Sequence, residues 1–191
     1  METKAITKDL TDEKLVREIV KNNNVMLFEE LYNRYEKRVY NKCYGFARSG
    51  AEAEDLTQDV FLMMFVKLGS FKGRSKFSSW VYSLTYNFCV NYVNRNKGRK
   101  INDKSDSISD DAERLSVVLE EDAILDLRVD KLKKALDLVS PEDKTILLLK
   151  YQDEVSIKEL SELMQIGESA VKMRLKRAKA RIEVIYNELP L

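Results

Sequence analysis

Apolar residues recur at helical spacing along most of this chain, and no segment has the sustained alternation of apolar and polar residues typical of a β-strand. Only two prolines and six glycines occur among 191 residues, so little interrupts a helix. A short first helix is predicted to begin near Thr11 or Asp12. Further helices are predicted over residues 25–48, 51–68, 78–96, 124–138, 141–151, 157–164 and 168–186. The pattern therefore predicts an all-α fold.

The predicted helices fall into two groups, separated by residues 98–122. This segment has few large apolar side chains, and residues 103–122 carry eight acidic residues against two basic ones. Such a composition cannot bury enough apolar surface to fold alone and is typical of a flexible linker. Two small helical domains are therefore predicted, residues 1–97 and residues 123–191, joined by an acidic linker.

The stretch from residue 60 to residue 102 contains no acidic residue, although charged residues make up 34% of the chain. Basic side chains attract phosphates, and flat rings stack on unpaired bases. Eight basic residues and nine aromatic residues lie in it: Lys67, Lys72, Arg74, Lys76, Arg95, Lys97, Arg99, Lys100, Phe61, Phe65, Phe71, Phe77, Trp80, Tyr82, Tyr86, Phe88 and Tyr92. The composition indicates a surface for a nucleic-acid strand, and the rings would suit a single strand.

The helix predicted over residues 78–96 has an apolar face and a polar strip beside it. The apolar face is expected to comprise Phe77, Trp80, Val81, Leu84 and Phe88, and the strip Ser83, Asn87, Asn91 and Asn94. Side-chain amides can bond base edges, but such a strip can also be an ordinary wet surface. Tyr82 and Tyr86 are predicted to lie off the buried face as stacking candidates, although either could instead cap the core.

The last two predicted helices are joined by a turn of about three residues, and the second is strongly basic, which suggests a helix-turn-helix. Val171, Leu175, Ala178 and Ile182 are predicted to form its buried face. Its opposite side would carry Ser169, Met173 and Lys176, flanked by Lys172 and Arg177. Residues of the first turn would contact base edges, and later residues would contact phosphates. The alternative is an ordinary amphipathic helix with a solvated basic face.

Composition excludes several other classes. Histidine is absent, and Cys43 and Cys89 are too far apart in sequence to form a metal-spacing pair. The N-terminus lacks the apolar core of a signal peptide, and the longest apolar run, residues 60–66, is too short to cross a bilayer. We therefore expect a cytoplasmic protein without membrane insertion, and no catalytic site, metal or cofactor is predicted.

Two blocks of the chain resemble known motifs. AEDLTQDVFL (residues 53–62) followed by FKGRSKFSSWVYSLTYNFCVNYVNR (residues 71–95) is similar to the second conserved region of bacterial sigma-70-type factors. SPEDKTILLLKYQDEVSIKELSELMQIGESAVKMRLKRAKARI (residues 140–182) is similar to their fourth region. The order of the blocks, the short length and the acidic linker resemble the extracytoplasmic-function (ECF) subgroup.

The resemblance implies a subunit that binds core RNA polymerase at its clamp and flap, locates promoter DNA and opens it. It also implies an anti-sigma factor as a partner. By position it implies three sets of residues. The set for the −10 element is Phe71, Lys72, Arg74, Lys76, Tyr82, Tyr86, Asn87, Asn91 and Arg95. The set for the −35 element is Glu168, Ser169, Lys172, Met173, Arg174, Lys176 and Arg177. The set for the polymerase is Asp55, Gln58, Asp59 and Phe61.

The chain departs from the family pattern at three positions. Asp59 stands where Glu is more usual, Gln165 where a turn glycine is common, and Gly167 where a capping serine is common. A non-glycine residue in a left-handed turn costs roughly 1 kcal/mol, so a less stable turn is expected.

Two other functions are weighed against this one. A nuclease could use Asp55, Asp59 and Glu52 to bind Mg²⁺, but no further carboxylate cluster completes such a site. A free-standing helix-turn-helix regulator would account for the C-terminal helices. It leaves the acid-free aromatic segment unexplained.

Overall fold

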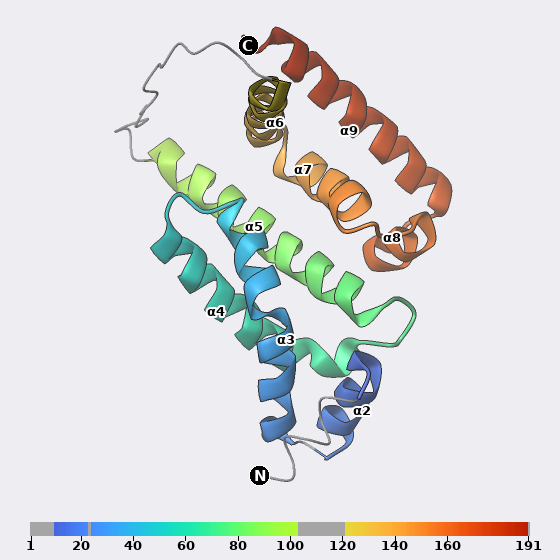
Figure 1. Cartoon of the computed structure of the whole chain (residues 1–191). Coiled ribbons are helices and arrows are strands. Elements are labelled where there is room, and N and C mark those ends of the chain that lie inside the picture. Colours follow the sequence, from blue (N-terminus) through green and yellow to red (C-terminus); the bar gives the residue numbers. More distant parts are fainter. Residues whose placement is uncertain (1–9, 23, 103–120, 191) are drawn as a thin grey trace.

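A computed structural model describes residues 10–22, 24–102 and 121–190, and every regular element within them is helical (Figure 1). The all-α prediction is confirmed for this part of the chain. The N-terminal elements are α2 (Asp12–Asn22), α3 (Val25–Tyr44), α4 (Gly50–Lys67), the short 3-10 turn η1 (Leu68–Ser70) and α5 (Phe77–Asn102). The C-terminal elements are α6 (Glu121–Leu138), α7 (Pro141–Leu147), the π-helical turn η2 (Leu148–Gln152), α8 (Ile157–Met164) and α9 (Glu168–Glu188).

Most helix boundaries follow from caps that the sequence already contains. The Ser140 hydroxyl accepts the Asp143 amide at 3.1 Å, with Pro141 in the first helical position. Ser156 and Glu159 form a complete capping box at the start of α8. These caps hold amide groups that the helix itself cannot pair, so the helices begin where predicted.

Several boundaries differ from the prediction. Helix α3 ends at Tyr44 because the chain turns there, with the amides of Phe46 and Ala47 both donating to the Cys43 carbonyl. The Phe46 ring then reaches Tyr86, 6.0 Å away between ring centres. Helix α5 continues to Asn102 and α6 starts at Glu121, so both extend into the predicted linker. The rest of that linker, residues 103–120, lies outside the described residues.

The N-terminal helices surround one core, built on residues such as Leu31, Tyr35, Val60 and Phe77. Cys43 and Cys89 are far apart in sequence, yet their sulfur atoms lie 4.0 Å apart inside this core as free thiols. The C-terminal helices enclose a second core around Leu149, Leu160 and Val171. Tyr86 of the N-terminal domain is buried in it, and Phe46 and Tyr82 pack against it.

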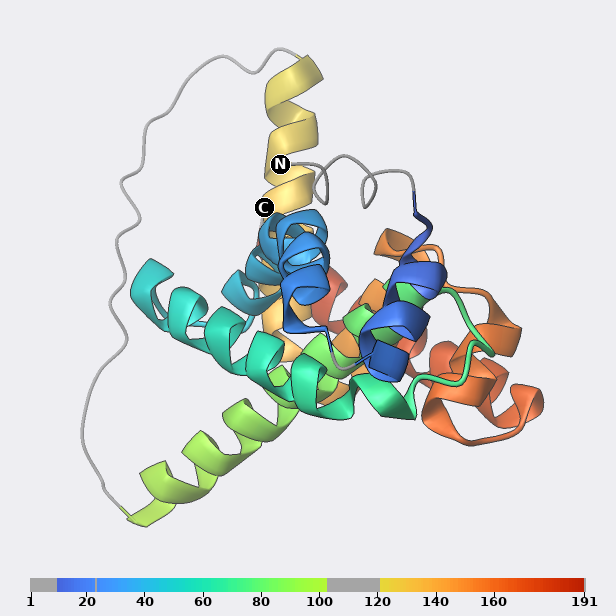
Figure 2. The same ribbon diagram turned by 90° about the horizontal axis from the view of Figure 1, so that it is seen from below.

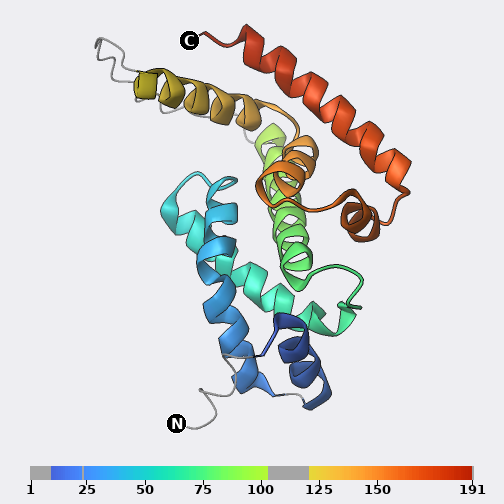
Figure 3. The same cartoon turned by 45° about the vertical axis from the view of Figure 1, so that its right-hand side comes forward.

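Helix α5 lies between the two groups of helices. Helices α3 and α4 pack on one side of it, and α7 and α8 lie on the other (Figures 2 and 3). The two domains are therefore in direct contact, and α5 carries most of that contact.

Gln165 ends α8 in the left-handed conformation, with φ 54° and ψ 40°. We expect Gln165→Gly to raise the free energy of unfolding by up to about 1 kcal/mol, because glycine has no Cβ to strain this conformation. Urea unfolding followed by circular dichroism measures the change. Lys158→Gly, in the exposed face of α8, is the matched control and should lower stability by a similar amount. A loss of stability in both variants would contradict the expectation.

Candidate nucleic-acid interface

Helix α9 has buried apolar residues on one side and exposed polar and basic residues on the other, as the spacing predicts. Val171, Leu175 and Ala178 are buried against the rest of the C-terminal domain. Arg181 fixes the helix to α7, because its Nη2 donates to Asp143 Oδ1 at 2.6 Å. All seven residues expected at the −35 element are exposed on α9: Glu168, Ser169, Lys172, Met173, Arg174, Lys176 and Arg177. The helix therefore presents a basic surface that is free to enter a major groove.

The turn before α9 is held without a serine cap. Gly167 occupies the cap position and makes no side-chain hydrogen bond, while the Ser161 hydroxyl donates to the Ile166 carbonyl at 2.6 Å. The closing residue Gln165 adopts the left-handed conformation that the sequence position required. The turn thus keeps its geometry despite the two departures from the family pattern.

The loop before α5 exposes its cations. Lys72, Arg74 and Lys76 are exposed, whereas the Phe71 ring packs edge-on against Phe77 with 5.2 Å between ring centres. The loop therefore offers three basic residues around a ring that is half-buried rather than free.

On α5 itself, Asn87, Asn91 and Arg95 are exposed as expected. Two predictions for this helix are wrong. Ser83, placed in the polar strip, is 6% exposed, and Tyr86, placed off the buried face, is 1% exposed. Tyr86 is buried because it packs into the hydrophobic cluster of the C-terminal domain, a contact that the helix's own periodicity cannot reveal. Tyr82 is half-buried.

Tyr86 and Tyr82 lie beside a buried ion pair that crosses the two domains. Lys42 on α3 contacts Asp153 after η2, and the two side chains are 6% and 7% exposed. The Lys42 ammonium also donates to the Tyr86 hydroxyl at 3.2 Å and lies 4.1 Å above the centre of the Tyr82 ring. Burial lowers the pKa of Lys42 although Asp153 acts in the opposite direction. Burial, and then the Asp153 carboxylate, raise the pKa of Tyr86.

The side of α4 that the family resemblance assigns to the polymerase has both polar and apolar residues. Asp55, Gln58 and Asp59 are exposed. Phe61 is 4% exposed in the core, where its ring meets Tyr32 with 4.4 Å between centres. Its predicted contact with polymerase therefore does not fit this structure, since the side chain faces inward.

Sequence reasoning missed two residues on the same helix. Leu62 and Val66 are 66% and 81% exposed and continue the helical row of Asp55 and Asp59. The signal that could have found them was the uninterrupted apolar run over residues 60–66. A helix buried on one side leaves part of such a run in solvent.

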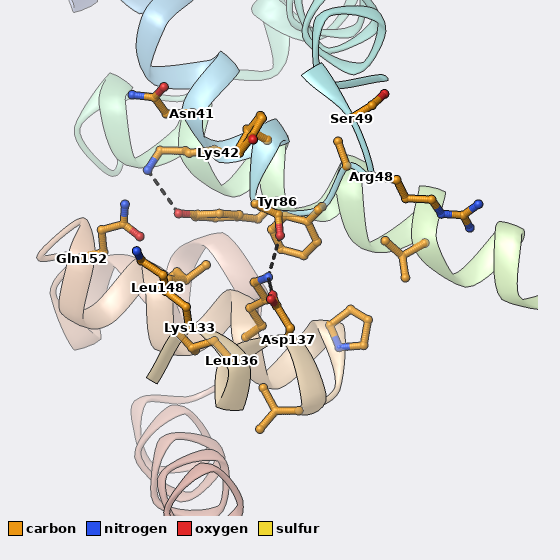
Figure 4. Close-up of a pocket in the computed structure, with 18 residues that line it drawn as sticks. Asn41, Lys42, Arg48, Ser49, Tyr86, Lys133, Leu136, Asp137, Leu148 and Gln152 are labelled. Carbon is orange, nitrogen blue, oxygen red and sulfur yellow. Dashed lines mark hydrogen bonds and ion pairs between the residues drawn. The ribbon is translucent and has the colours of Figure 1, made fainter. Parts of the chain in front are cut away.

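Two hollows accompany these surfaces. A cavity of about 770 Å³ lies between the domains, with Lys42, Arg48 and Tyr86 on one wall and Lys133, Leu148 and Gln152 on the other (Figure 4). An apolar groove of about 540 Å³ runs between α6, η2 and α9, lined by residues such as Leu132, Leu136 and Tyr151.

Within the described residues, no three acidic or cysteine side chains gather closely enough to hold a metal ion. None of the described helices is long and apolar enough to cross a membrane.

Comparisons with known proteins agree with this arrangement. The family model for Sigma-70 region 2 matches residues 31–99, and the model for Sigma-70, region 4 matches residues 130–182. The chain is 28% identical over 176 residues to ECF RNA polymerase sigma factor SigW of Bacillus subtilis, covering 89% of this chain and 94% of that protein. It is 27% identical over 188 residues to the ECF RNA polymerase sigma-E factor of Haemophilus influenzae, covering 93% and 96%.

Two solved structures share the fold. CnrH, in complex with the cytosolic domain of CnrY, superposes with a TM-score of 0.61 at 17% identity, over 92% of this chain and 97% of that one. The sigma factor RpoE of Bartonella quintana, in complex with the anti-sigma factor NepR, gives 0.58 at 21% identity, over 85% and 98%. An exposed basic helix after a tight turn, in a chain with a second helical domain, is the arrangement expected of a two-domain DNA-binding protein. The chain belongs to the sigma-70 family of RNA polymerase sigma factors, in its ECF group.

Proposed function

We propose that this sigma factor binds core RNA polymerase, directs it to specific promoters and promotes DNA opening. The observation that carries the proposal is the pairing, in one chain, of an exposed basic helix-turn-helix with an acid-free helix bearing exposed amides and cations. The first suits duplex DNA and the second suits an unpaired strand. A free-standing regulator needs only the first.

The residue roles follow from exposure. On α9, residues of the first two turns, such as Ser169 and Met173, would meet base edges at the −35 element, and Lys176 would meet phosphate. At the −10 element, Lys72 and Arg74 would hold the backbone while Asn87 and Asn91 bond bases. Extruding a base costs a few kcal/mol, which contacts to that base must offset.

Two surfaces suit the polymerase. The exposed row of Asp55, Gln58 and Asp59 on α4, extended by Leu62 and Val66, combines polar and apolar groups as protein interfaces do, and we assign it to the clamp. The apolar groove of about 540 Å³ in the C-terminal domain is assigned to the flap.

The remaining assignments follow from the family. The subunit supplies promoter specificity and has no catalytic site of its own. It acts in the cytoplasm, where the polymerase is. The Bartonella relative is held by an anti-sigma factor, and we assign this chain a regulator of the same kind.

Transcription reconstitution tests the proposal. Purified chain is added to core polymerase free of other sigma factors, with fragmented genomic DNA, and transcript starts are sequenced. Discrete starts that share two upstream motifs are expected. Absence of both starts and core binding, with palindromic footprints on DNA alone, would instead identify a free-standing regulator.

Substitutions at the residues proposed to bind single-stranded DNA should impair promoter opening but leave assembly with core polymerase intact. Asn87→Ala and Tyr82→Ala are expected to reduce promoter opening by at least about fivefold, because the first removes a hydrogen bond to a base edge and the second a stacking ring, each worth about 1–3 kcal/mol, while core binding is unchanged. Permanganate reactivity of −10 thymines measures opening. Asn22→Ala, on the exposed end of α2, is the control. Wild-type reactivity in both variants would contradict these roles.

Lys176→Ala should weaken promoter binding by the holoenzyme without changing sequence preference. The slope of log affinity against log salt should become about 0.9 less negative, the value for one lost phosphate contact. Filter binding over a salt series measures the slope, and Glu183→Ala on the same helix is the comparison. A changed base preference would mean that Lys176 contacts a base.

A further inference from the structure

The loop over residues 71–76, assigned above to the −10 element, is fixed in different ways at its two ends. At its start, the Phe71 amide donates to the Leu68 carbonyl at 3.1 Å, which closes η1. Its end is set by Phe77, where α5 begins. Between the two ends, Gly73 has a positive φ of 68°, and the residues on both sides of it are exposed. The conformation of this exposed loop therefore depends on what holds its ends.

The first turn of α5 takes its cap from a different helix. The turn contains no acidic residue, so its unpaired amides have no carboxylate of their own. Glu13 of α2, 64 residues earlier in the chain, supplies one, because its Oε1 accepts the Phe77 amide at 3.1 Å in a partly buried position. A carboxylate there also suits the positive end of the helix dipole. Glu13 thus fixes the residue at which the loop ends and α5 begins.

A second carboxylate reaches the same place from the C-terminal domain. Glu159 Oε1 accepts the Lys76 amide at 3.1 Å, one residue before the amide that Glu13 holds. Glu13 lies in the same domain as the loop, so its hydrogen bond does not depend on the position of the C-terminal domain. Of the two carboxylates, Glu13 is therefore the one that belongs to the loop's own domain.

Helix α2 is itself fixed at the turn that carries Glu13. The neighbouring Asp12 carboxylate accepts hydrogen bonds from Arg34 Nη1, at 2.8 Å, and from the Tyr35 hydroxyl, both on α3. The Leu10 carbonyl also accepts from Arg34 Nη1 at 2.8 Å. Further along α2, three apolar side chains are buried in the core. Glu13 therefore projects from a backbone whose place in the domain is set by other contacts.

Phe77 connects the end of the loop to its start. Its ring is fully buried and packs edge-on against Phe71, the first residue of the loop, with 5.2 Å between ring centres. It also packs against Tyr35 of α3 and stacks on Trp80, each with 5.6 Å between centres. The residue whose amide Glu13 holds is therefore in contact with both ends of the loop.

The other end of α2 lies beside η1, where the loop begins (Figure 1). Val20 is close to Gly69 there, because a Cβ on Gly69 would lie 4.0 Å from Val20 Cγ1, an ordinary van der Waals distance. Helix α2 therefore reaches the chain before the loop through Val20 and the chain after it through Glu13. One helix of 11 residues spans the opening of the loop.

We propose that Glu13 is a positioning residue for the loop over residues 71–76. By capping α5 at the Phe77 amide, it holds the loop in the conformation that receives an extruded base. The proposal rests on the proposed function, since it concerns the same −10 site. Without the cap, the first turn of α5 frays and the loop lengthens, so that ordering it costs conformational entropy when the base is captured. A loop that is held in place before DNA arrives avoids that cost.

The test uses holoenzyme assembled from core polymerase and the full chain. Glu13→Ala removes the acceptor. Glu13→Gln keeps an oxygen at the same reach without the charge, whereas Glu13→Asp keeps the charge and withdraws the oxygen by one methylene. Glu18→Ala is the control, because it removes an exposed carboxylate whose hydrogen bond, from Asn22, lies within α2. Acrylamide quenching of Trp80 reports fraying of α5, and melting curves establish folding. If Glu13→Ala does not fold, the other two variants at this position decide.

The readouts are the affinities of each holoenzyme for two fragments of a reconstituted promoter. One is a fork with the −10 strand unpaired, and the other is a duplex that carries the −35 element alone. Glu13→Ala and Glu13→Asp are expected to bind the fork about fivefold more weakly, the ratio for loss of one helix cap, and to increase quenching of Trp80. Glu13→Gln and Glu18→Ala should match the wild type. Affinity for the −35 duplex should be unchanged throughout, because α9 lies in the other domain.

Three results would overturn the positioning role. The first is wild-type affinity for the fork in the folded alanine and aspartate variants. The second is an equal loss on both fragments, which indicates general destabilisation. The third is a loss in Glu13→Gln as large as in Glu13→Asp, which would mean that the hydrogen bond to Phe77 is not what matters. In all three cases the wild-type holoenzyme still binds the fork and the sigma function stands. If the wild-type holoenzyme does not bind the fork, the proposed function is overturned, and the positioning role with it.

Discussion

Replacing Phe61 with alanine is expected to lower the free energy of unfolding of the N-terminal domain by about 3–5 kcal/mol. The side chain is 4% exposed and packs against Tyr32 and Phe28, with 4.4 and 6.5 Å between ring centres. Alanine would leave a cavity that the surrounding helices can only partly close. Any loss of polymerase binding in this variant would follow from lost folding rather than from a lost contact.

The chain offers a clean measurement of this effect. Its single tryptophan, Trp80, lies in the N-terminal domain, 5.6 Å from Phe77 between ring centres. Its fluorescence during urea unfolding therefore reports on that domain. Leu62→Ala is the control, since an exposed neighbour on the same helix should change stability by no more than about 0.5 kcal/mol. Equal stability of the Phe61 and Leu62 variants would show that Phe61 is not part of the core.

The second large effect concerns the outer side of the same helix. Leu62→Asp with Val66→Asp should reduce affinity for core polymerase by about 100-fold. These side chains are 66% and 81% exposed in the free chain, so the aspartates cost little in folding. In the complex they would place two charges in an interface core, where an unpaired charge is costly. Gln58→Ala, which removes one exposed amide, should have a smaller effect in the same direction.

Competition against labelled wild-type chain for core polymerase measures this change. Val184→Asp, on α9 at a position 56% exposed, places a charge on an apolar surface residue outside the α4 row. It should bind as the wild type does. If the Leu62 and Val66 double variant is as stable as the wild type and competes for core polymerase equally well, the polymerase contact does not lie on this face of α4.

The sequence alone was sufficient to predict where the helices lie and which residues α9 exposes. Hydrogen bonds of a helix join residues four apart, and caps such as Ser140 and the Ser156–Glu159 box act within three residues. The buried side of α9, with Val171, Leu175 and Ala178, follows from a period of 3.6 residues. Local chemistry determines such features, and the family motifs rest on the same local blocks.

Only the tertiary structure decided which residues a second domain covers. Lys42 and Asp153 are 111 residues apart, and nothing near either one in sequence indicates the other. Tyr86 and Ser83 occupy positions that the periodicity of α5 assigns to solvent, yet a second packed face buries them. Phe61 and Leu62 are neighbours in one apolar run, and packing against α3 alone determines which of them is buried. Periodicity identifies a helix's faces, but what covers each face depends on contacts between residues distant in the chain.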